Sequence, residues 1–294
     1  MQGNDSFKKY IIFNEETNEF ENQEHYRDSH ESEITMFYGE EFSDNLDKVI
    51  LVAPDEMDEV EKELYKSITK ILSKSKSAGS YASKHNLIDN KTDKIMVYPN
   101  DYAGLSIITT KDESSEKDMI YAVFPFFSEG REYKCKIKSL FFDDNEKDSK
   151  EGQIEAFIDE EENLLLTFYD MHFIDNQSLY NPDDTFVFSI MGLAKNIEKI
   201  DNDDMISLTP DYDLPSEEYT AETIVKEIKL LDKEINGEKV WKLTVVIGYT
   251  PDGEDIPLDV YATSRSFEDS AIPQVDDNIR VSISIHGYLK DIEK

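Results

Sequence analysis

Hydrophobic residues recur along the chain with two different periods. Between residues 54 and 77, apolar side chains repeat at steps of three and four, which is the pattern of a helix with one buried face. Further on, Tyr133, Cys135 and Ile137 alternate with three lysines, which is the period of a strand. The pattern predicts one long helix in the N-terminal third and mainly strands after about residue 119.

The N-terminal region carries further short apolar runs besides this helix. A polar, acidic stretch from residue 14 to residue 33 has too little apolar content to pack, so we expect a loop there. A short helical turn is expected at residues 81–85. Strands are expected at residues 10–13, 34–38, 49–52, 95–98 and 105–107. Residues 1–112 are therefore predicted to form a small α/β domain, which a charged, serine-containing linker separates from the next unit.

The strongest signal in the sequence is an internal repeat. The first copy begins with Leu166-Thr167-Phe168-Tyr169 and ends with Gly192-Leu193-Ala194-Lys195. The second copy begins with Leu258-Asp259-Val260-Tyr261 and ends with Gly287-Tyr288-Leu289-Lys290. Self-similarity at a nearly constant offset indicates two copies of one small domain. We place these domains at residues 119–200 and 217–294.

Each copy contains four or five short strands, joined by turns such as Pro251-Asp252-Gly253. This pattern over residues 119–294 resembles tandem OB-fold barrels at the level of strand number and spacing. The predicted fold class is therefore α+β: a small N-terminal α/β domain followed by two related antiparallel β-barrel domains that are OB-like. Because OB folds typically bind single-stranded nucleic acid on aromatic side chains, the resemblance also implies a possible stacking role for Tyr169, Phe173, Trp241 and Tyr261.

The charge of the chain indicates which classes of partner it can bind. Its 294 residues include 65 acidic and 31 basic side chains, which give a formal net charge of −34. Such a field repels nucleic acid and anionic membranes and favours basic protein partners. Rows of carboxylates at strand spacing can also imitate the phosphates of a nucleic acid.

No motif for catalysis, cofactor binding or metal binding stands out. His25 and His30 are spaced too loosely for a metal site, and the segment from Asp144 to Glu155 lacks the glycine that a calcium loop needs at its bend. Cys135 is the only cysteine. Because no such motif is present, we expect a protein without enzymatic activity or a cofactor. The sequence lacks a secretory signal and a membrane-spanning run, so we expect the protein to be cytoplasmic.

We therefore expect a non-enzymatic, acidic protein-interaction module or adaptor. One alternative is a nucleic-acid-mimicking inhibitor of a DNA- or RNA-processing enzyme, and another is a single-stranded nucleic-acid binder of the OB type. Arg280 and His286 lie on the expected polar face of the last strand. The residues expected to contact a protein partner are Tyr169, His172, Tyr261, Arg280 and His286.

Overall fold

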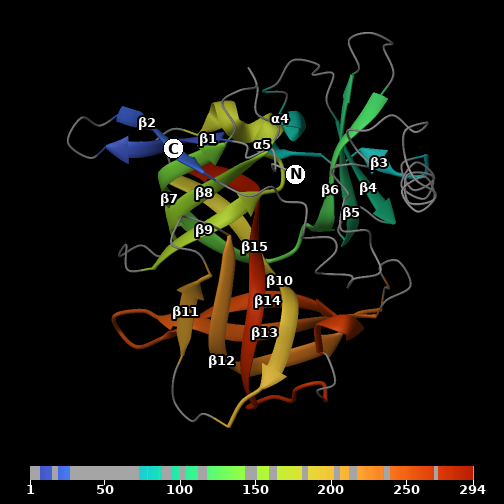
Figure 1. Cartoon of the computed structure of the whole chain (residues 1–294), viewed down its shortest axis with the longest axis vertical. Helices are drawn as coiled ribbons and strands as arrows, with labels where there is room; N and C mark the ends of the chain where they lie inside the picture. Colours follow the sequence, from blue (N-terminus) through green and yellow to red (C-terminus); the bar gives the residue numbers. More distant parts are fainter. Residues whose placement is uncertain are drawn as a thin grey trace, which may run out of the picture.

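The computed structural model describes residues 7–14, 19–26, 73–77, 79–85, 87, 94–99, 103–111, 118–142, 151–158, 164–180, 185–201, 206–211, 217–232, 234, 239–267 and 271–293. Within these residues the chain is built mainly of strands, which form one sheet of 11 strands and a second sheet of four (Figure 1). The order in the large sheet is β11-β12-β13-β14-β10-β15-β9-β8-β7-β1-β2, and the order in the small sheet is β3-β4-β5-β6.

Most elements of the described chain are strands, and the helices between them are short. In chain order, the first part comprises β1 (Phe7–Asn14), β2 (Glu19–Tyr26), β3 (Lys76–Ser77), α4 (Tyr81–Lys84), β4 (Lys94–Pro99), β5 (Ala103–Lys111) and β6 (Asp118–Phe127). The middle part comprises β7 (Arg131–Phe142), β8 (Gly152–Phe157), β9 (Leu165–Asp170), α5 (Phe173–Asn176), the 3-10 helix η1 (Gln177–Leu179) and β10 (Thr185–Lys199). The last part comprises β11 (Ser207–Pro210), β12 (Glu218–Leu230), β13 (Val240–Tyr249), β14 (Asp255–Thr263), the 3-10 helix η2 (Ser264–Phe267) and β15 (Asn278–Glu293).

The large sheet closes on itself twice. Ring 1 consists of β7, β8, β9, β15 and β10, and it closes because β10 pairs back with β7. Ring 2 consists of β12, β13, β14, β10 and β15, and it closes because β15 pairs back with β12. The long strands β10 and β15 therefore belong to both rings, and they run between the two units in Figure 1.

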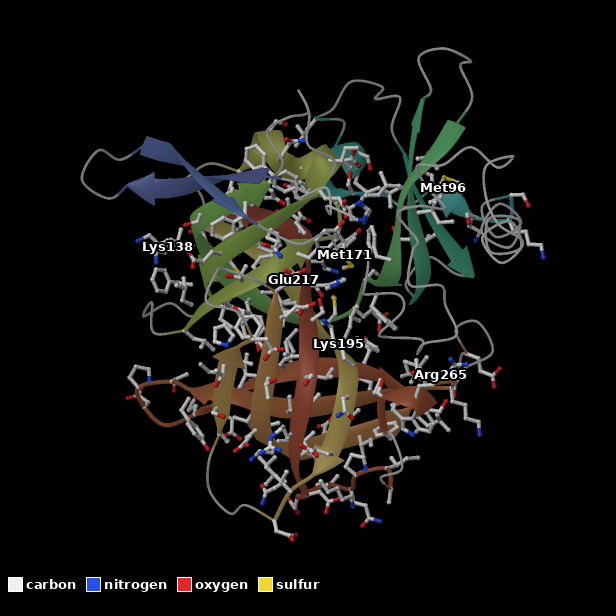
Figure 2. All side chains as sticks on the ribbon, in the orientation of Figure 1. Met96, Lys138, Met171, Lys195, Glu217 and Arg265 are labelled. Atoms are coloured by element: carbon white, nitrogen blue, oxygen red, sulfur yellow. The ribbon has the colours of Figure 1, made fainter. Side chains whose placement is uncertain are left out.

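The two copies of the sequence repeat exchange strands with each other. β10 of the first copy pairs in parallel with β14 of the second, and β15 of the second copy pairs in parallel with β9 of the first. β10 and β15 are antiparallel to one another, and Met191 lies opposite His286 where ring 1 meets ring 2. Close to this junction the Met171 N–H donates to the Gly287 carbonyl at 3.0 Å, and the Ile285 N–H donates to the Glu217 carbonyl at 2.8 Å (Figure 2).

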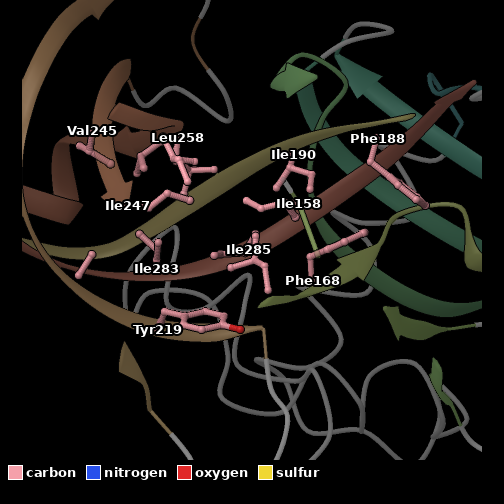
Figure 3. Close-up of a cluster of buried hydrophobic side chains, with 14 of the residues drawn as sticks. Ile158, Phe168, Phe188, Ile190, Tyr219, Val245, Ile247, Leu258, Ile283 and Ile285 are labelled. Carbon is pink, nitrogen blue, oxygen red and sulfur yellow. The ribbon is translucent and has the colours of Figure 1, made fainter. Parts of the chain in front are cut away.

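One continuous hydrophobic core fills both rings. Figure 3 shows members from ring 1, including Phe168 and Phe188, together with members from ring 2 such as Leu258. The Thr167 N–H in β9 also donates to the Tyr219 hydroxyl of β12 at 2.8 Å, so a hydrogen bond joins the rings beside this core. Full burial of a side chain the size of Phe168 or Phe188 contributes about 2 to 3 kcal/mol of hydrophobic free energy. The rings are thus expected to unfold as one unit.

The predicted α+β class with an N-terminal α/β domain is wrong. Among the described residues of 1–112 the structure has strands β1 to β5 and one helix, the four-residue α4, which matches the helical turn expected at residues 81–85. Most of the long helix predicted at residues 54–77 lies outside the described residues, as do the strands predicted at 34–38 and 49–52, while residues 76 and 77 form β3. The short runs around residues 10, 95 and 105 do form strands, but β1 pairs with β7 and β5 pairs with β6. β6 and β7 lie beyond residue 112, and local periodicity does not report pairing with such distant strands.

The prediction of a loop at residues 14–33 is also wrong in part. Residues 19–26 form β2, which pairs along its whole length with β1. Strand pairing uses backbone hydrogen bonds, so a polar sequence can add to a sheet without burying its own side chains.

Strand pairs cross the boundaries between the predicted domain ranges 1–112, 119–200 and 217–294. The hairpin of β5 and β6 spans the first of these boundaries, and β10 and β15 each contribute to both rings. The ranges stay a prediction, and a division along them would have to separate paired strands.

The turn between β13 and β14 gives a simple test of local backbone conformation. Gly253 has φ of +83°, and a Cβ atom placed there would meet nothing within 4 Å. The substitution G253A is therefore expected to lower the free energy of unfolding by about 1 kcal/mol through backbone strain alone, and G253N by less. Urea unfolding measures both, and equal stability of G253A and wild type would contradict the left-handed conformation of this turn.

Candidate functional site

A row of mostly polar side chains crosses the outer face of the shared strands. Neighbouring members of this row are direct register partners, so their side chains point to the same side of the sheet. All of them are 5% exposed or less. We call them the buried row: Gln153 (β8), Tyr169 (β9), His286 (β15), Met191 (β10), Asp259 (β14) and Thr244 (β13).

The small sheet covers the buried row. The Phe124 ring of β6 lies edge-on to the Tyr169 ring at 5.2 Å and 6.5 Å from the His286 ring. Three residues further on, Phe127 stacks on Tyr261 with 4.0 Å between ring centroids, and the Tyr261 hydroxyl donates to the Glu129 carbonyl at 2.7 Å. The polar face of the rings is therefore buried by aromatic contacts with a second sheet rather than exposed to water.

Asp259 is the charged member of the buried row. It accepts hydrogen bonds from Arg131 Nε at 3.1 Å and Thr244 Oγ1 at 2.9 Å, and Lys242 Nζ lies 2.7 Å from its second carboxylate oxygen. Burial alone would raise the pKa of Asp259, but the hydrogen bonds from Lys242 and Thr244 and the charges of Lys242 and Arg131 outweigh burial and lower that pKa below its ordinary value. Asp259 is therefore ionised, and the positive charges of Arg131 and Lys242 compensate its negative charge.

Three of the five residues predicted to contact a partner meet at this interface. Tyr169 and His286 are neighbours in the buried row, with their rings 5.3 Å apart, and Tyr261 stacks under Phe127. The sequence pattern placed His286 on a polar face exposed to water, yet it is buried, because strand alternation shows which face is polar but not whether a second sheet covers it. Tyr169, Tyr261 and His286 present almost no surface to a protein partner.

His172 lies apart from the row, in a second polar cluster at the end of ring 1. Its backbone N–H donates to Asp170 Oδ1 at 3.0 Å, and the Tyr180 hydroxyl donates to the other carboxylate oxygen of Asp170. Burial raises the pKa of Asp170 to about 7, and burial together with the charge of Lys84 lowers the pKa of His172 to about 3. Both side chains are 1% exposed, so this cluster also lacks access to a partner.

Contacts from α4 cover the same end of ring 1. Lys84 Nζ donates to the Tyr288 hydroxyl at 2.6 Å, which in turn donates to the Gly79 carbonyl at 2.7 Å. The Ala82 N–H donates to Asn176 Oδ1 at 3.2 Å. The polar cluster is thus closed by a segment nearly 100 residues earlier in the chain, which fixes the position of α4 on α5.

Arg280 is the only one of the five predicted residues with an exposed side chain, at 47%. On ring 2 it bridges two carboxylates, with Nη1 2.6 Å from Glu198 of β10 and Nη2 2.7 Å from Glu222 of β12. These ion pairs connect three neighbouring strands across the surface of ring 2. Exposed pairs of this kind contribute little to stability.

Exposed apolar side chains concentrate on ring 2, a feature that the sequence patterns did not reveal. Of the five large apolar side chains most exposed among the described residues, one is Leu87, and the other four belong to β12, β13 or the segment between β14 and β15: Leu230, Tyr249, Ile272 and Val275, with exposed fractions of 44 to 53%. Exposed carboxylates lie nearby in the chain: Asp252 and Glu254 in the turn between β13 and β14, Asp255 at the start of β14, and Asp276 between β14 and β15.

Two of these apolar positions are connected by Lys226. Its Nζ lies 2.9 Å from Asp255, which is the register partner of Tyr249, and the negative charge of Asp276 also acts on it. Asp276, which directly follows Val275, donates its N–H to the Val225 carbonyl. Leu230 lies at the other end of β13, where it is the register partner of Trp241. We call Tyr249 and Val275, with their neighbouring carboxylates Asp255 and Asp276, the ring 2 surface.

Within the described residues, no group of three or more His, Cys, Asp or Glu side chains is arranged to hold a metal ion. None of the helices in the same part of the chain combines the length and the apolar character needed to cross a membrane. Searches of protein-family models, curated proteins and solved structures find no match to this chain. The resemblance to OB folds stays a prediction.

Proposed function

We propose that this protein is a non-enzymatic, cytoplasmic interaction module that binds a basic protein partner through the ring 2 surface. The observation that carries this proposal is that Tyr249 and Val275 are exposed beside the carboxylates of Asp255 and Asp276. Apolar side chains with a polar rim are the usual composition of a protein contact. The net charge of −34 favours a partner with basic residues around its own apolar contact.

The buried titratable groups support a binding role over a catalytic one. Asp170, His172 and His286 are each 1% exposed or less, and Asp259 is held between Arg131 and Lys242. General acid or base catalysis requires a group within hydrogen-bond reach of a substrate. In this arrangement the same groups hold elements of the fold together.

A charge substitution on the ring 2 surface tests the proposal. The double variant Y249E/V275E is expected to reduce capture of a basic protein from host lysate by about tenfold or more, because it replaces both apolar contacts of the surface with carboxylates. Quantitative mass spectrometry of proteins bound to the immobilised full chain gives the measurement. The variant L87E, which makes the same change at an exposed apolar residue outside ring 2, is the matched control.

Salt dependence separates the proposal from the alternatives. Binding through an apolar contact with an acidic rim should weaken only moderately from low to high salt, whereas imitation of nucleic acid predicts that binding collapses. Unchanged capture by Y249E/V275E would contradict the proposal, as would recovery of nucleic acid in place of a protein.

A further inference from the structure

Two buried polar side chains face the interface between the small sheet and the rings without a hydrogen bond. Ser106 of β5 and Gln153 of β8 are both 0% exposed. Within the part of the chain that the structure describes, neither Ser106 Oγ nor the amide oxygen and nitrogen of Gln153 has a hydrogen-bond partner. Buried polar groups in native proteins are almost always satisfied, so these three atoms require an explanation.

Their positions place them around one group of aromatic rings. Ser106 is the register partner of Phe124 in the small sheet, so its side chain lies on the face that Phe124 presents to Tyr169 and His286. Gln153 is the register partner of Tyr169, so its side chain lies on the same face of the large sheet as the Tyr169 side chain. The serine hydroxyl and the glutamine amide thus come from opposite sheets toward the rings of Phe124, Tyr169 and His286.

We propose that this interface is a binding site for a neutral, planar molecule that carries a hydrogen-bond donor next to an acceptor, which is the chemistry of a nucleobase. A glutamine amide presents one acceptor and one donor group side by side and can pair with both on the edge of a base. Aromatic side chains offer faces and edges against which a planar ring packs. Ser106 would supply the third hydrogen bond from the opposite sheet.

The charges near the site favour a neutral ligand. Asp259 is paired with Arg131 and Lys242, and the Glu151 carboxylate accepts a hydrogen bond from the Tyr169 hydroxyl at 2.9 Å. A charged ligand would therefore have to be buried without a matching opposite charge, which is strongly unfavourable. A phosphate group would in addition meet the overall negative charge of the chain. These considerations favour a free base or nucleoside over a base within a nucleic-acid strand.

Entry of the ligand requires the small sheet to move. Phe124 and Phe127 hold this sheet against the rings, and the site between them is closed. Association should therefore be slower than for an open pocket, since binding waits for a conformational change.

Thermal unfolding of the full chain with adenosine, guanosine, cytidine or uridine, each alone at millimolar concentration, tests the proposal. At least one nucleoside is expected to raise the unfolding midpoint of the wild-type protein, because a ligand that binds only the folded state stabilises it. The substitution Q153L should abolish this shift. Without ligand, Q153L should instead raise the midpoint by a few degrees, since it removes a buried amide that has no partner.

The opposite signs of these two effects distinguish a ligand-binding role from a structural one, because a glutamine needed for folding would lower the midpoint when replaced. The smaller change S106A keeps the test decisive if Q153L does not fold, and it should weaken nucleoside binding about tenfold in calorimetric titration. Q274L, the same substitution at an exposed glutamine on ring 2, is the matched control and should leave binding unchanged.

A short single-stranded DNA oligonucleotide distinguishes the two sources of a base. A shift with nucleosides that equals or exceeds the shift with the oligonucleotide identifies a free ligand, whereas a larger, salt-sensitive shift with the oligonucleotide identifies a base within a strand. The proposal is overturned if none of these probes shifts the midpoint, or if Q153L and S106A bind nucleosides as well as the wild type does.

Discussion

Replacing Asp170 with asparagine is expected to increase the free energy of unfolding relative to the wild type as the pH rises, by about 3 kcal/mol between pH 5 and pH 8. Burial raises the pKa of the Asp170 carboxyl group from 3.8 to about 7 in the folded protein. The stability that its protonated form provides is fully present below about pH 4 and is lost as the pH rises to 7, because only the unfolded chain ionises readily in that range. The D170N variant has no ionisable group at this position and escapes the loss.

Urea unfolding in small steps from pH 5 to pH 8 measures this effect. Lower pH is avoided because the isoelectric point of the chain is about 4.4, where a low net charge promotes association. The variant D252N makes the same chemical change at the exposed turn between β13 and β14 and is the matched control. A pH-independent difference for D170N would contradict the prediction.

The Tyr180 hydroxyl provides a second control within the same cluster. Its hydrogen bond to Asp170 stabilises the ionised carboxylate and so opposes the effect of burial on the pKa of Asp170. In Y180F the pKa of Asp170 should rise further, and the loss of stability should move to higher pH. Movement to lower pH would mean that another group controls the titration.

Much of the strand content could be predicted from the sequence, because each strand leaves a local signature. The alternation at Tyr133 to Lys138 lies within β7, where Cys135 and Ile137 are buried and Lys134 and Lys136 are exposed. The leading segments of the two copies lie in β9 and β14, and their closing segments lie within β10 and β15. These features depend on residues that are close together in the chain.

Pairing between distant strands could not be predicted in the same way. The repeat suggested two separate barrels, but β10 and β15 each complete the ring of the other copy. The choice between pairing within a copy and pairing across copies depends on the packing of distant strands, which local periodicity does not contain. Matching glycines, Gly192 and Gly287, were visible in the sequence, although their role at the crossing of the strands was not.

Burial of the candidate site residues could not be predicted from the sequence either. Tyr169, Tyr261 and His286 were chosen from the sequence as exposed aromatic and polar residues, and the small sheet covers all three. Tyrosine and histidine are intermediate in how often they are buried, so the residue type alone does not predict whether such a side chain is exposed. Whether that interface faces water or a second sheet depends on β5 and β6, which lie 40 or more residues before Tyr169 in the chain.

A large effect of a single added methyl group is expected at Gly287. A Cβ atom at this position would lie 2.3 Å from Cδ2 of Phe168, whose ring is fully buried and packs edge-on against Phe188 at 5.0 Å. Real Cβ atoms do not approach so closely, and the ring cannot leave the core of ring 1 without leaving a cavity. The substitution G287A is therefore expected to lower the free energy of unfolding by about 3 kcal/mol through overpacking, as measured by urea unfolding.

The sequence repeat supplies the matched control for this prediction. Gly192 is the corresponding glycine of the first copy, and a Cβ atom there would lie 3.1 Å from Cγ2 of Val260, a contact that small side-chain shifts can relieve. G192A should therefore cost less than about 1 kcal/mol. In the double variant G287A/F168L, the smaller side chain should recover part of the stability lost in G287A, which a double-mutant cycle measures as a coupling between positions 168 and 287. Equal costs for G287A and G192A, or the absence of coupling, would contradict the close approach of β15 to β9 that joins the second copy of the repeat to ring 1.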